Sequence, residues 1–251
     1  MPNTLLEHLG AGKPAAGIIV FSGSPLVVEV AAAARLDFVI LDMEHSALDL
    51  ERAAHLVRAA DAAGIAPFVR VPGLDAALIN KVLNLGAAGI VLPHADRASC
   101  AELVKAMRYA PLGERGACQL TRAAGYVRGN WENYAERVNR DVMAIALIED
   151  AASVREIDAI AAVPGIDACF VGPTDLSIAL GVPGASFDDE KLGAALDTVI
   201  AATHRHGKYA MTLLGMKLDS GYRERVCARG VQMLVLGTDA DMLMDAFTRL
   251  R

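Results

Sequence analysis

The stretch from Met143 to Asp175, MAIALIEDAASVREIDAIAAVPGIDACFVGPTD, contains the pattern that decides the fold. An apolar run, MAIALI, ends at Glu149, a helix-like segment follows, and a second apolar run, ACFV, begins at Ala168. Short apolar runs suit strands that are buried on both faces, and a helix between two such runs is typical of a parallel βαβ unit. We therefore expect a parallel sheet covered by helices.

The same alternation extends outward over the rest of the chain. Eight apolar runs occur in all: GIIVFS (17–22), FVILDME (38–44), PFVRVP (67–72), GIVLPH (89–94), MAIALIE (143–149), ACFVG (168–172), KYAMT (208–212) and QMLVLG (232–237). Helix-like segments separate them, and four of these segments end in a glycine of the kind that terminates helices: Gly64, Gly86, Gly207 and Gly230. Eight βα units are what a closed barrel requires, so we predict an α/β fold, a single (β/α)8 TIM barrel whose catalytic domain spans residues 1–251.

One connection departs from this regularity. The loop after the fourth predicted strand, residues 111–141, is far longer than a typical connection and carries five arginines and the only tryptophan. Loops of this length are usually functional or form an interface. We expect this segment to cover the barrel mouth or to contact a neighbouring subunit.

Composition limits the classes of partner. The chain of 251 residues is 54% hydrophobic and 5% aromatic, and its formal charge is −6. A nucleic-acid partner calls for a basic surface, which this composition does not offer. The start of the sequence does not resemble a secretory leader, and no apolar run reaches the roughly 20 residues of a membrane span. We expect a cytoplasmic protein with neither nucleic acid nor membrane as a partner.

The cysteines are scattered along the chain without a CxxC pair: Cys100, Cys118, Cys169 and Cys227. This spacing suggests neither a zinc knuckle nor a disulfide framework. We interpret all four as structural residues, with Cys169 in the core.

Polar side chains stand where the predicted strands end. These residues are Asp42, Glu44 and His45 after the second strand, Arg70 in the third, His94 after the fourth, Glu149 and Asp150 after the fifth, and Asp175 after the sixth. In a barrel of this type the active site forms at the carboxyl ends of the strands. Closure of the barrel would gather these side chains around one rim.

Two of the rim carboxylates suggest a metal site. Glu149 and Asp175 follow neighbouring strands, and carboxylate pairs suit oxygen-seeking cations such as Mg²⁺ or Mn²⁺. The remaining coordination positions would be open to a 2-oxo acid, whose carbonyl oxygen the cation would polarise. The alternative is that Glu149 caps the following helix and Asp175 caps the turn after Pro173.

Arg70 and His45 have both a catalytic and a structural interpretation. A guanidinium inside an apolar strand is costly unless it meets an anion. Arg70 therefore either forms a salt bridge with Asp42 or Glu44, or neutralises an enolate or carbonyl oxygen of the substrate. His45 is either a proton-transfer group oriented by a carboxylate or a satisfied rim residue.

The turn that begins at Gly172 and Pro173 would leave backbone N–H groups free to bind a carboxylate. A turn of this kind is weak evidence by itself. For VLPHAD, a helix-capping role for Asp96 and packing for His94 are equally consistent, and we leave His94 out of the predicted site.

In combination, LDMEH, VRVP, GIVLPH, ALIED and FVGPTDLSIALG resemble the HpcH/HpaI aldolase family, in the same order over nearly the whole chain. The resemblance implies a (β/α)8 barrel that depends on a divalent cation such as Mg²⁺, Mn²⁺ or Co²⁺. It further implies a homohexamer built from trimers, with exchange of the last helix.

The resemblance also implies roles for individual residues. Glu149 and Asp175 look like the two metal ligands, Arg70 like the residue that faces the pyruvyl oxygen, and His45 with Asp42 like the pair that transfers a proton through water. The carboxylate cradle corresponds to Gly172, Pro173, Thr174 and Asp175. Two positions depart from the family pattern: Leu147 replaces a frequent Gln and Asn84 a frequent Asp, which leaves the choice of donor and acceptor open.

The predicted function is reversible cleavage of a 4-hydroxy-2-oxo acid to pyruvate, or a related 2-oxo acid, and an aldehyde. A Schiff-base mechanism would need a lysine at a strand carboxyl end, and Lys208 opens its strand at the opposite end. Two alternatives remain: another C–C lyase or decarboxylase that uses the same metal and enolate, and a non-catalytic barrel with a binding or assembly role.

Overall fold

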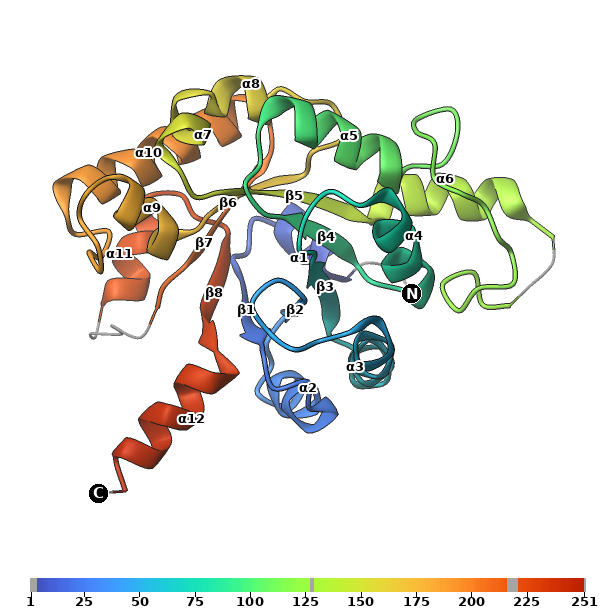
Figure 1. Ribbon diagram of the computed structural model, residues 1–251, viewed down its shortest axis with the longest axis horizontal. Coiled ribbons are helices and arrows are strands. Elements are labelled where there is room, and N and C mark those ends of the chain that lie inside the picture. The colour runs from blue at the N-terminus through green and yellow to red at the C-terminus, as the bar shows by residue number, and fades with distance from the viewer. Residues whose placement is uncertain (1–3, 127–128, 216–220, 251) are drawn as a thin grey trace.

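The computed structural model describes residues 4–126, 129–215 and 221–250. Its core is a closed barrel of eight strands in the order β1 to β8, each parallel to the next, with β8 paired to β1 (Figure 1). The strands are β1 (Ala15–Val20), β2 (Phe38–Asp42), β3 (Ala66–Arg70), β4 (Gly89–Leu92), β5 (Met143–Ile148), β6 (Ala168–Val171), β7 (Tyr209–Leu213) and β8 (Met233–Thr238). The predicted (β/α)8 fold is confirmed, and every strand overlaps its predicted run.

Helices surround this barrel (Figure 1). They are α1 (Thr4–Gly10), α2 (Pro25–Ala33), α3 (Leu50–Ala63), α4 (Ala76–Leu85), α5 (Arg97–Met107), α6 (Trp131–Asp141), α7 (Ala151–Arg155), α8 (Ile157–Ala161), α9 (Pro173–Ala179), α10 (Glu190–Arg205), α11 (Tyr222–Ala228) and α12 (Asp239–Thr248). The last of them, α12, projects away from the barrel at the lower left of Figure 1. Its Met244 and Phe247 and the following Leu250 are exposed.

Alternation along the strands separates two packed layers. Inward-facing side chains fill the barrel interior, among them Phe38, Ile40, Phe68, Leu147 and Phe170, while the residues between them pack against the helices. Continuing the inward series by two residues reaches Asp42 on β2 and Arg70 on β3. The register pairs these two residues side by side, so their side chains enter the barrel mouth together.

The long segment at 111–141 contains a helix that we did not predict. Within α6, Ala135 and Val138 are buried, and Trp131 lies edge-on to Tyr109 with ring centroids 4.9 Å apart. Apolar and aromatic residues thus recur every three to four positions, which is the period of an amphipathic helix. The cluster of arginines around them concealed this pattern.

This segment lies at the end of the barrel opposite the mouth. Arg122 donates to the carbonyl of Leu85 and to Asp61, and the amide of Ala123 donates to the carbonyl of Asn84. These partners stand at the ends of α3 and α4, next to the start of β3 and β4. The expectation that the segment covers the mouth is therefore wrong for its described residues, and contact with a neighbouring subunit stays a prediction.

The cysteines carry free thiols. Cys100 and Cys169 are buried, and burial raises the pKa of Cys100 to about 12 and that of Cys169 to about 11. Cys227 is half-buried and Cys118 is exposed, so Cys118 does not belong to the core.

Within the described ranges, no helix has the length and apolar character needed to cross a lipid bilayer.

Candidate active site

A buried ion pair occupies the mouth of the barrel beside β2 and β3. Arg70 Nε donates to Asp42 Oδ1 at 2.9 Å and Nη2 donates to Oδ2 at 2.6 Å. Asp42 Oδ1 also accepts the backbone amides of Glu44 at 3.0 Å and His45 at 3.4 Å. A guanidinium has five N–H donors, and this fork uses two of them. Asp42 thus holds Arg70 in place while donor capacity remains for a ligand.

Glu44 adds a second carboxylate to this group. Its Oε2 lies 3.4 Å from Arg70 Nε and 3.6 Å from His45 Nε2, yet the atom is buried and has no hydrogen-bond partner among the described residues. The His45 side chain is 53% exposed at the rim. Its imidazole faces Glu44, whereas Asp42 contacts His45 only through the backbone amide. The predicted proton-transfer pair is therefore adjacent, but its two side chains are not in direct contact.

Glu149 follows β5 and is buried. Its Oε1 accepts the backbone amide of His94 at 2.7 Å, and His94 Nδ1 lies 3.1 Å from the same oxygen. Burial raises the pKa of Glu149; the amide and ring of His94 oppose the rise, and the charges of Glu44 and Asp175 add to it. The capping alternative fails at this position, because the N-cap of α7 is the neighbouring Asp150.

Gly172 directly follows β6 and lies beside Glu149. A Cβ added to Gly172 would lie 3.4 Å from Glu149 Oε2 and 3.3 Å from its Cβ, so the absence of a side chain keeps space beside this carboxylate. Pro173, Thr174 and Asp175 then form the first turn of α9, whose N-terminus has no side-chain cap. The space beside Oε2 is thus bordered by the start of α9.

The residues at this rim fit a divalent cation. Glu149 and Asp175 act electrostatically on each other, and the glycine leaves room beside Glu149. The described residues contain no group of three or more His, Cys, Asp or Glu side chains placed as metal ligands. Two carboxylates with the remaining positions open to water and substrate are a common arrangement for Mg²⁺.

The two departures from the family pattern lie at different ends of the barrel. Leu147 is buried inside it, and its Cδ1 is 3.2 Å from the position a Cβ of Gly172 would take. Asn84 instead accepts from Arg115 Nη2 at 3.1 Å, near the segment that contains α6. Leu147 therefore gives the site an apolar floor, while Asn84 lies far from the site of its own chain.

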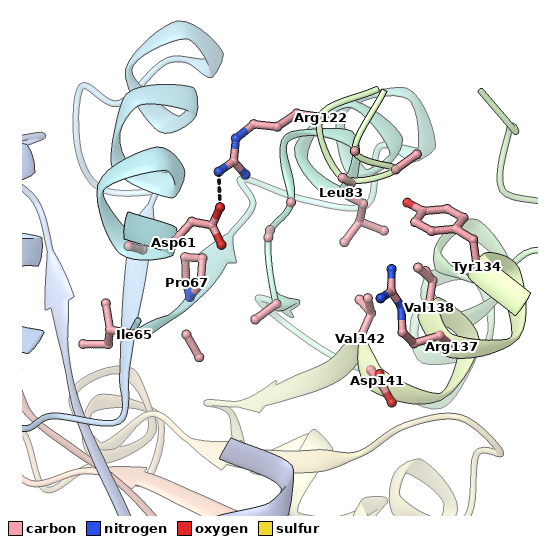
Figure 2. A pocket seen from close by; sticks show the side chains of 18 of the residues that line it. Asp61, Ile65, Pro67, Leu83, Arg122, Tyr134, Arg137, Val138, Asp141 and Val142 are labelled. Atoms are coloured by element: carbon pink, nitrogen blue, oxygen red, sulfur yellow. Dashed lines mark hydrogen bonds and ion pairs between the residues drawn. The ribbon is translucent and has the colours of Figure 1, made fainter. Parts of the chain in front are cut away.

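A hollow of about 600 Å³ also opens at this opposite end (Figure 2). Arg122 reaches Asp61 on one side of it, and Tyr134 and Arg137 of α6 lie on the other. The guanidinium of Arg137 lies 5.7 Å from the centre of the Tyr134 ring. The residues that line the hollow thus make structural contacts at the amino ends of the strands. The rim carboxylates stand at the opposite, carboxyl ends.

The sequence-based prediction of the site omitted Glu44 and His94. Glu44 stood in the quoted motif LDMEH, and its position just after the end of β2, next to Asp42 and opposite Arg70 on β3, was the signal that could have included it. His94 adopts a left-handed backbone conformation, with φ 49°. No residue of the motif VLPHAD predicts this conformation. Both residues contact a predicted site residue, and the predicted site residues lie at or just after the ends of β2, β3, β5 and β6 and at the start of α9.

Buried carboxylates beside an arginine at the carboxyl end of a TIM barrel define an enzyme site that can bind a cation and a small anion. Comparison with known proteins identifies the family to which this enzyme belongs. The family described as HpcH/HpaI aldolase/citrate lyase matches residues 16–246, and the chain belongs to this family. It is an enzyme of the carbon–carbon lyase class.

Individual relatives agree with this assignment. A 2-dehydro-3,6-dideoxy-6-sulfogluconate aldolase of Pseudomonas putida is 36% identical over 87% of this chain and 88% of its own. A hydroxypyruvate/pyruvate aldolase of Paraburkholderia phytofirmans is 33% identical over 94% of this chain and 95% of its own. The citrate synthase SbnG, known from a crystal structure, is 36% identical in sequence. Its structure matches with a TM-score of 0.86 and covers 98% of this chain and 95% of that one.

Proposed function

We propose that this enzyme is a divalent-metal-dependent aldolase that reversibly cleaves a 4-hydroxy-2-oxo acid to pyruvate, or a related 2-oxo acid, and an aldehyde. The observation that carries the proposal is the pair of Glu149 and Asp175 beside the space at Gly172, at the same end of the barrel as the buried guanidinium of Arg70. Carboxylates that bind a cation and an arginine that binds an oxyanion are the two elements that this chemistry needs.

Glu149 and Asp175 would hold the cation. When bound, Mg²⁺, Mn²⁺ or Co²⁺ supplies a Lewis acid that polarises the 2-oxo group of the substrate. Arg70, fixed by Asp42, directs its remaining N–H donors at the oxygen on which negative charge develops. The uncapped amides at Thr174 and Asp175 would bind the substrate carboxylate, with Gly172 and Pro173 shaping the turn.

His45 is the group best placed to move the proton of the 4-hydroxyl. Its imidazole is half-exposed at the rim and faces Glu44 at 3.6 Å, so it is oriented by a carboxylate and open to a water or a substrate hydroxyl. Asp42 contributes through the backbone amide of His45 and through Arg70. The proton-transfer group that we propose is therefore His45, oriented by Glu44. Asp42 supports both through their backbone amides.

A second candidate reaction keeps the same residues. The relative SbnG is named a citrate synthase, so a similar chain is associated with a different carbon–carbon bond reaction. The same cation and Arg70 could stabilise the oxyanion of either reaction. An assay that follows both pyruvate release and condensation products separates the two candidates.

We also propose a closed homo-oligomer, with a hexamer as the form that the family resemblance implies. Met244, Phe247 and Leu250 are exposed at the projecting α12 and its end, and an apolar surface of this kind favours a partner surface. Sedimentation at micromolar concentration measures the mass directly. A monomer of 26.4 kDa would contradict this proposal.

The decisive test of the activity is a pyruvate-release assay over a panel of 4-hydroxy-2-oxo acids. The protein is stripped with EDTA and then supplied with Mg²⁺, Mn²⁺ or Co²⁺. We expect turnover only with added metal, and none in Glu149→Gln or Asp175→Asn although both variants fold. Full turnover without metal, or in either variant, would contradict the proposal. A wild type that is inert with every substrate and metal would favour the non-catalytic alternative.

A further inference from the structure

The two oxygens of Glu149 have different surroundings. Oε1 accepts the backbone amide of His94 at 2.7 Å and lies 3.1 Å from His94 Nδ1. Oε2 faces the space at Gly172, and no hydrogen bond to it from the described residues is present. His94 thus makes two contacts with Oε1 of Glu149, while Oε2 remains available to a ligand.

The backbone at His94 is arranged for this contact. His94 has φ 49°, a left-handed conformation that costs a residue with a Cβ roughly 1–2 kcal/mol. Conformations of this kind persist where the surrounding structure fixes them, and they gather at functional sites. Here the conformation aims the amide and the ring of the same residue at one carboxylate oxygen from the end of the neighbouring strand.

We propose that His94 is a positioning residue for the metal site: it holds Oε1 of Glu149 from both its amide and its ring, so that Oε2 is presented to the cation. The inference rests on the proposed metal-dependent function. The His94 side chain is 71% exposed, yet its Nδ1 edge contacts Glu149, so the ring acts through the carboxylate without needing to touch substrate. Groups that orient a metal ligand in this way typically change metal affinity about 10- to 100-fold when removed.

His45 provides a contrast on the same rim. Its ring also faces a carboxylate, but that carboxylate is Glu44 and the distance is 3.6 Å. The two histidines are therefore expected to differ in what they control: His94 controls metal affinity, and His45 controls turnover.

The test is a calorimetric titration of the metal-stripped enzyme with Mn²⁺, paired with the visible absorption spectrum of the Co²⁺ form. His94→Gly keeps the left-handed backbone and its amide but removes the ring, and we expect the Kd to rise about 10- to 100-fold. His94→Asn also tolerates this conformation and carries an amide nitrogen near the position of Nδ1, so we expect it to recover most of the affinity. His45→Asn is the matched control, with a Kd within about twofold of the wild type and reduced turnover.

Each outcome decides a separate point. An unchanged Kd in His94→Gly, with metal binding lost in Glu149→Gln, would overturn the role of His94 and leave the proposed function standing. Equal weakening in His94→Gly and His94→Asn would support the role of the ring itself, because the Asn amide would then not replace the contact of Nδ1 with Glu149. Wild-type metal affinity in Glu149→Gln would instead overturn the proposed metal site itself. Circular dichroism melting confirms that each variant is folded, and His94→Ala, which also removes the ring, replaces His94→Gly with the same expected rise in Kd if His94→Gly is not folded.

Discussion

Two buried charged groups, Arg108 at one end of the barrel and Glu44 at the other, are satisfied to different degrees. At the amino ends of β5 and β6, Arg108 donates to Asp167 at 3.1 Å, to the carbonyl of Gly165 at 3.2 Å and to the carbonyl of Val142. At the carboxyl ends, Glu44 has a buried oxygen without a hydrogen bond. Arg108 is thus paired within the chain, whereas Glu44 Oε2 has only the ion-pair contacts with Arg70 at 3.4 Å and His45 at 3.6 Å. The carboxylate cluster at the carboxyl end therefore keeps capacity to bind a cation or a proton donor.

Electrostatics supports this contrast. Burial raises the pKa of Asp167, but Arg108 and the amide of Ala144 oppose the rise. Burial also raises the pKa of Glu149, and His94 opposes that rise, but there the charges of Glu44 and Asp175 add to it. Like charges gathered in a partly buried site destabilise the metal-free protein, and a cation would remove that cost.

The largest expected effect is a loss of stability when the donor of the paired group at the amino end, Arg108, is removed. Arg108→Ala would leave Asp167 and two carbonyls without their donor, and breaking a buried pair of this kind costs about 3–5 kcal/mol. We expect a large loss of stability in urea unfolding, with kcat little changed in the folded fraction. The loss should shrink as pH falls and Asp167 becomes protonated.

Arg140→Ala is the matched control for Arg108→Ala. Arg140 pairs with Asp141 on the exposed surface, where an ion pair contributes little. A similar loss of stability in both variants would remove the distinction between a buried and an exposed pair at this end.

The second effect is on turnover. Arg70→Lys keeps the charge but loses the planar fork, and removing one such donor to a developing oxyanion typically costs about 10²- to 10³-fold in rate. Metal-dependent exchange of the pyruvate methyl protons, followed by NMR in deuterium oxide, isolates this step from aldol cleavage. Arg122→Lys changes a guanidinium at the opposite end in the same way and should leave exchange unaltered. Wild-type exchange in Arg70→Lys would refute its role.

The third effect is a gain in stability. The folded pKa of Glu149 is raised above its ordinary value of 4.5, so a charged Glu149 destabilises the metal-free protein. Glu149→Gln should therefore raise the Tm of the metal-free protein at neutral pH, by about 2–4 °C for each kcal/mol removed. The difference should diminish as pH falls through the raised pKa and vanish below 4.5. A lower Tm in the variant at neutral pH would show that the carboxylate is not under strain.

Much of the fold could be predicted from the sequence because two signals agreed: the spacing of the apolar runs and the positions of the glycines that end helices. The apolar runs and the helix-ending glycines indicated the strands and their direction, and the described Gly64 and Gly86 do end α3 and α4 in left-handed conformations. The helix α6 was missed because its apolar face is short and charged residues separate the few residues that pack.

The site was predictable in outline only. Position at a strand end was enough to select Glu149, Asp175 and Arg70, since a closed barrel gathers strand ends. The contact between His94 and Glu149 depends on a backbone angle, and the burial of Glu44 depends on packing around Arg70. Neither quantity is visible in residue type or spacing.

The smallest effect separates two neighbours in sequence, Glu149 and Asp150. Asp150 accepts the amide of Ser153 at 2.7 Å and forms a capping box at the start of α7. Asp150→Ala should lower stability by about 1 kcal/mol, the usual contribution of an N-cap. Asp150→Asn should restore most of that stability, because Asn caps nearly as well. Neither change should alter the Kd for Mn²⁺, since the Asp150 carboxylate is committed to the helix, whereas Glu149→Gln should abolish binding. If Asp150→Asn weakened metal binding as much as Glu149→Gln, the division of labour between these adjacent carboxylates would be wrong, and the metal site would have to extend onto α7.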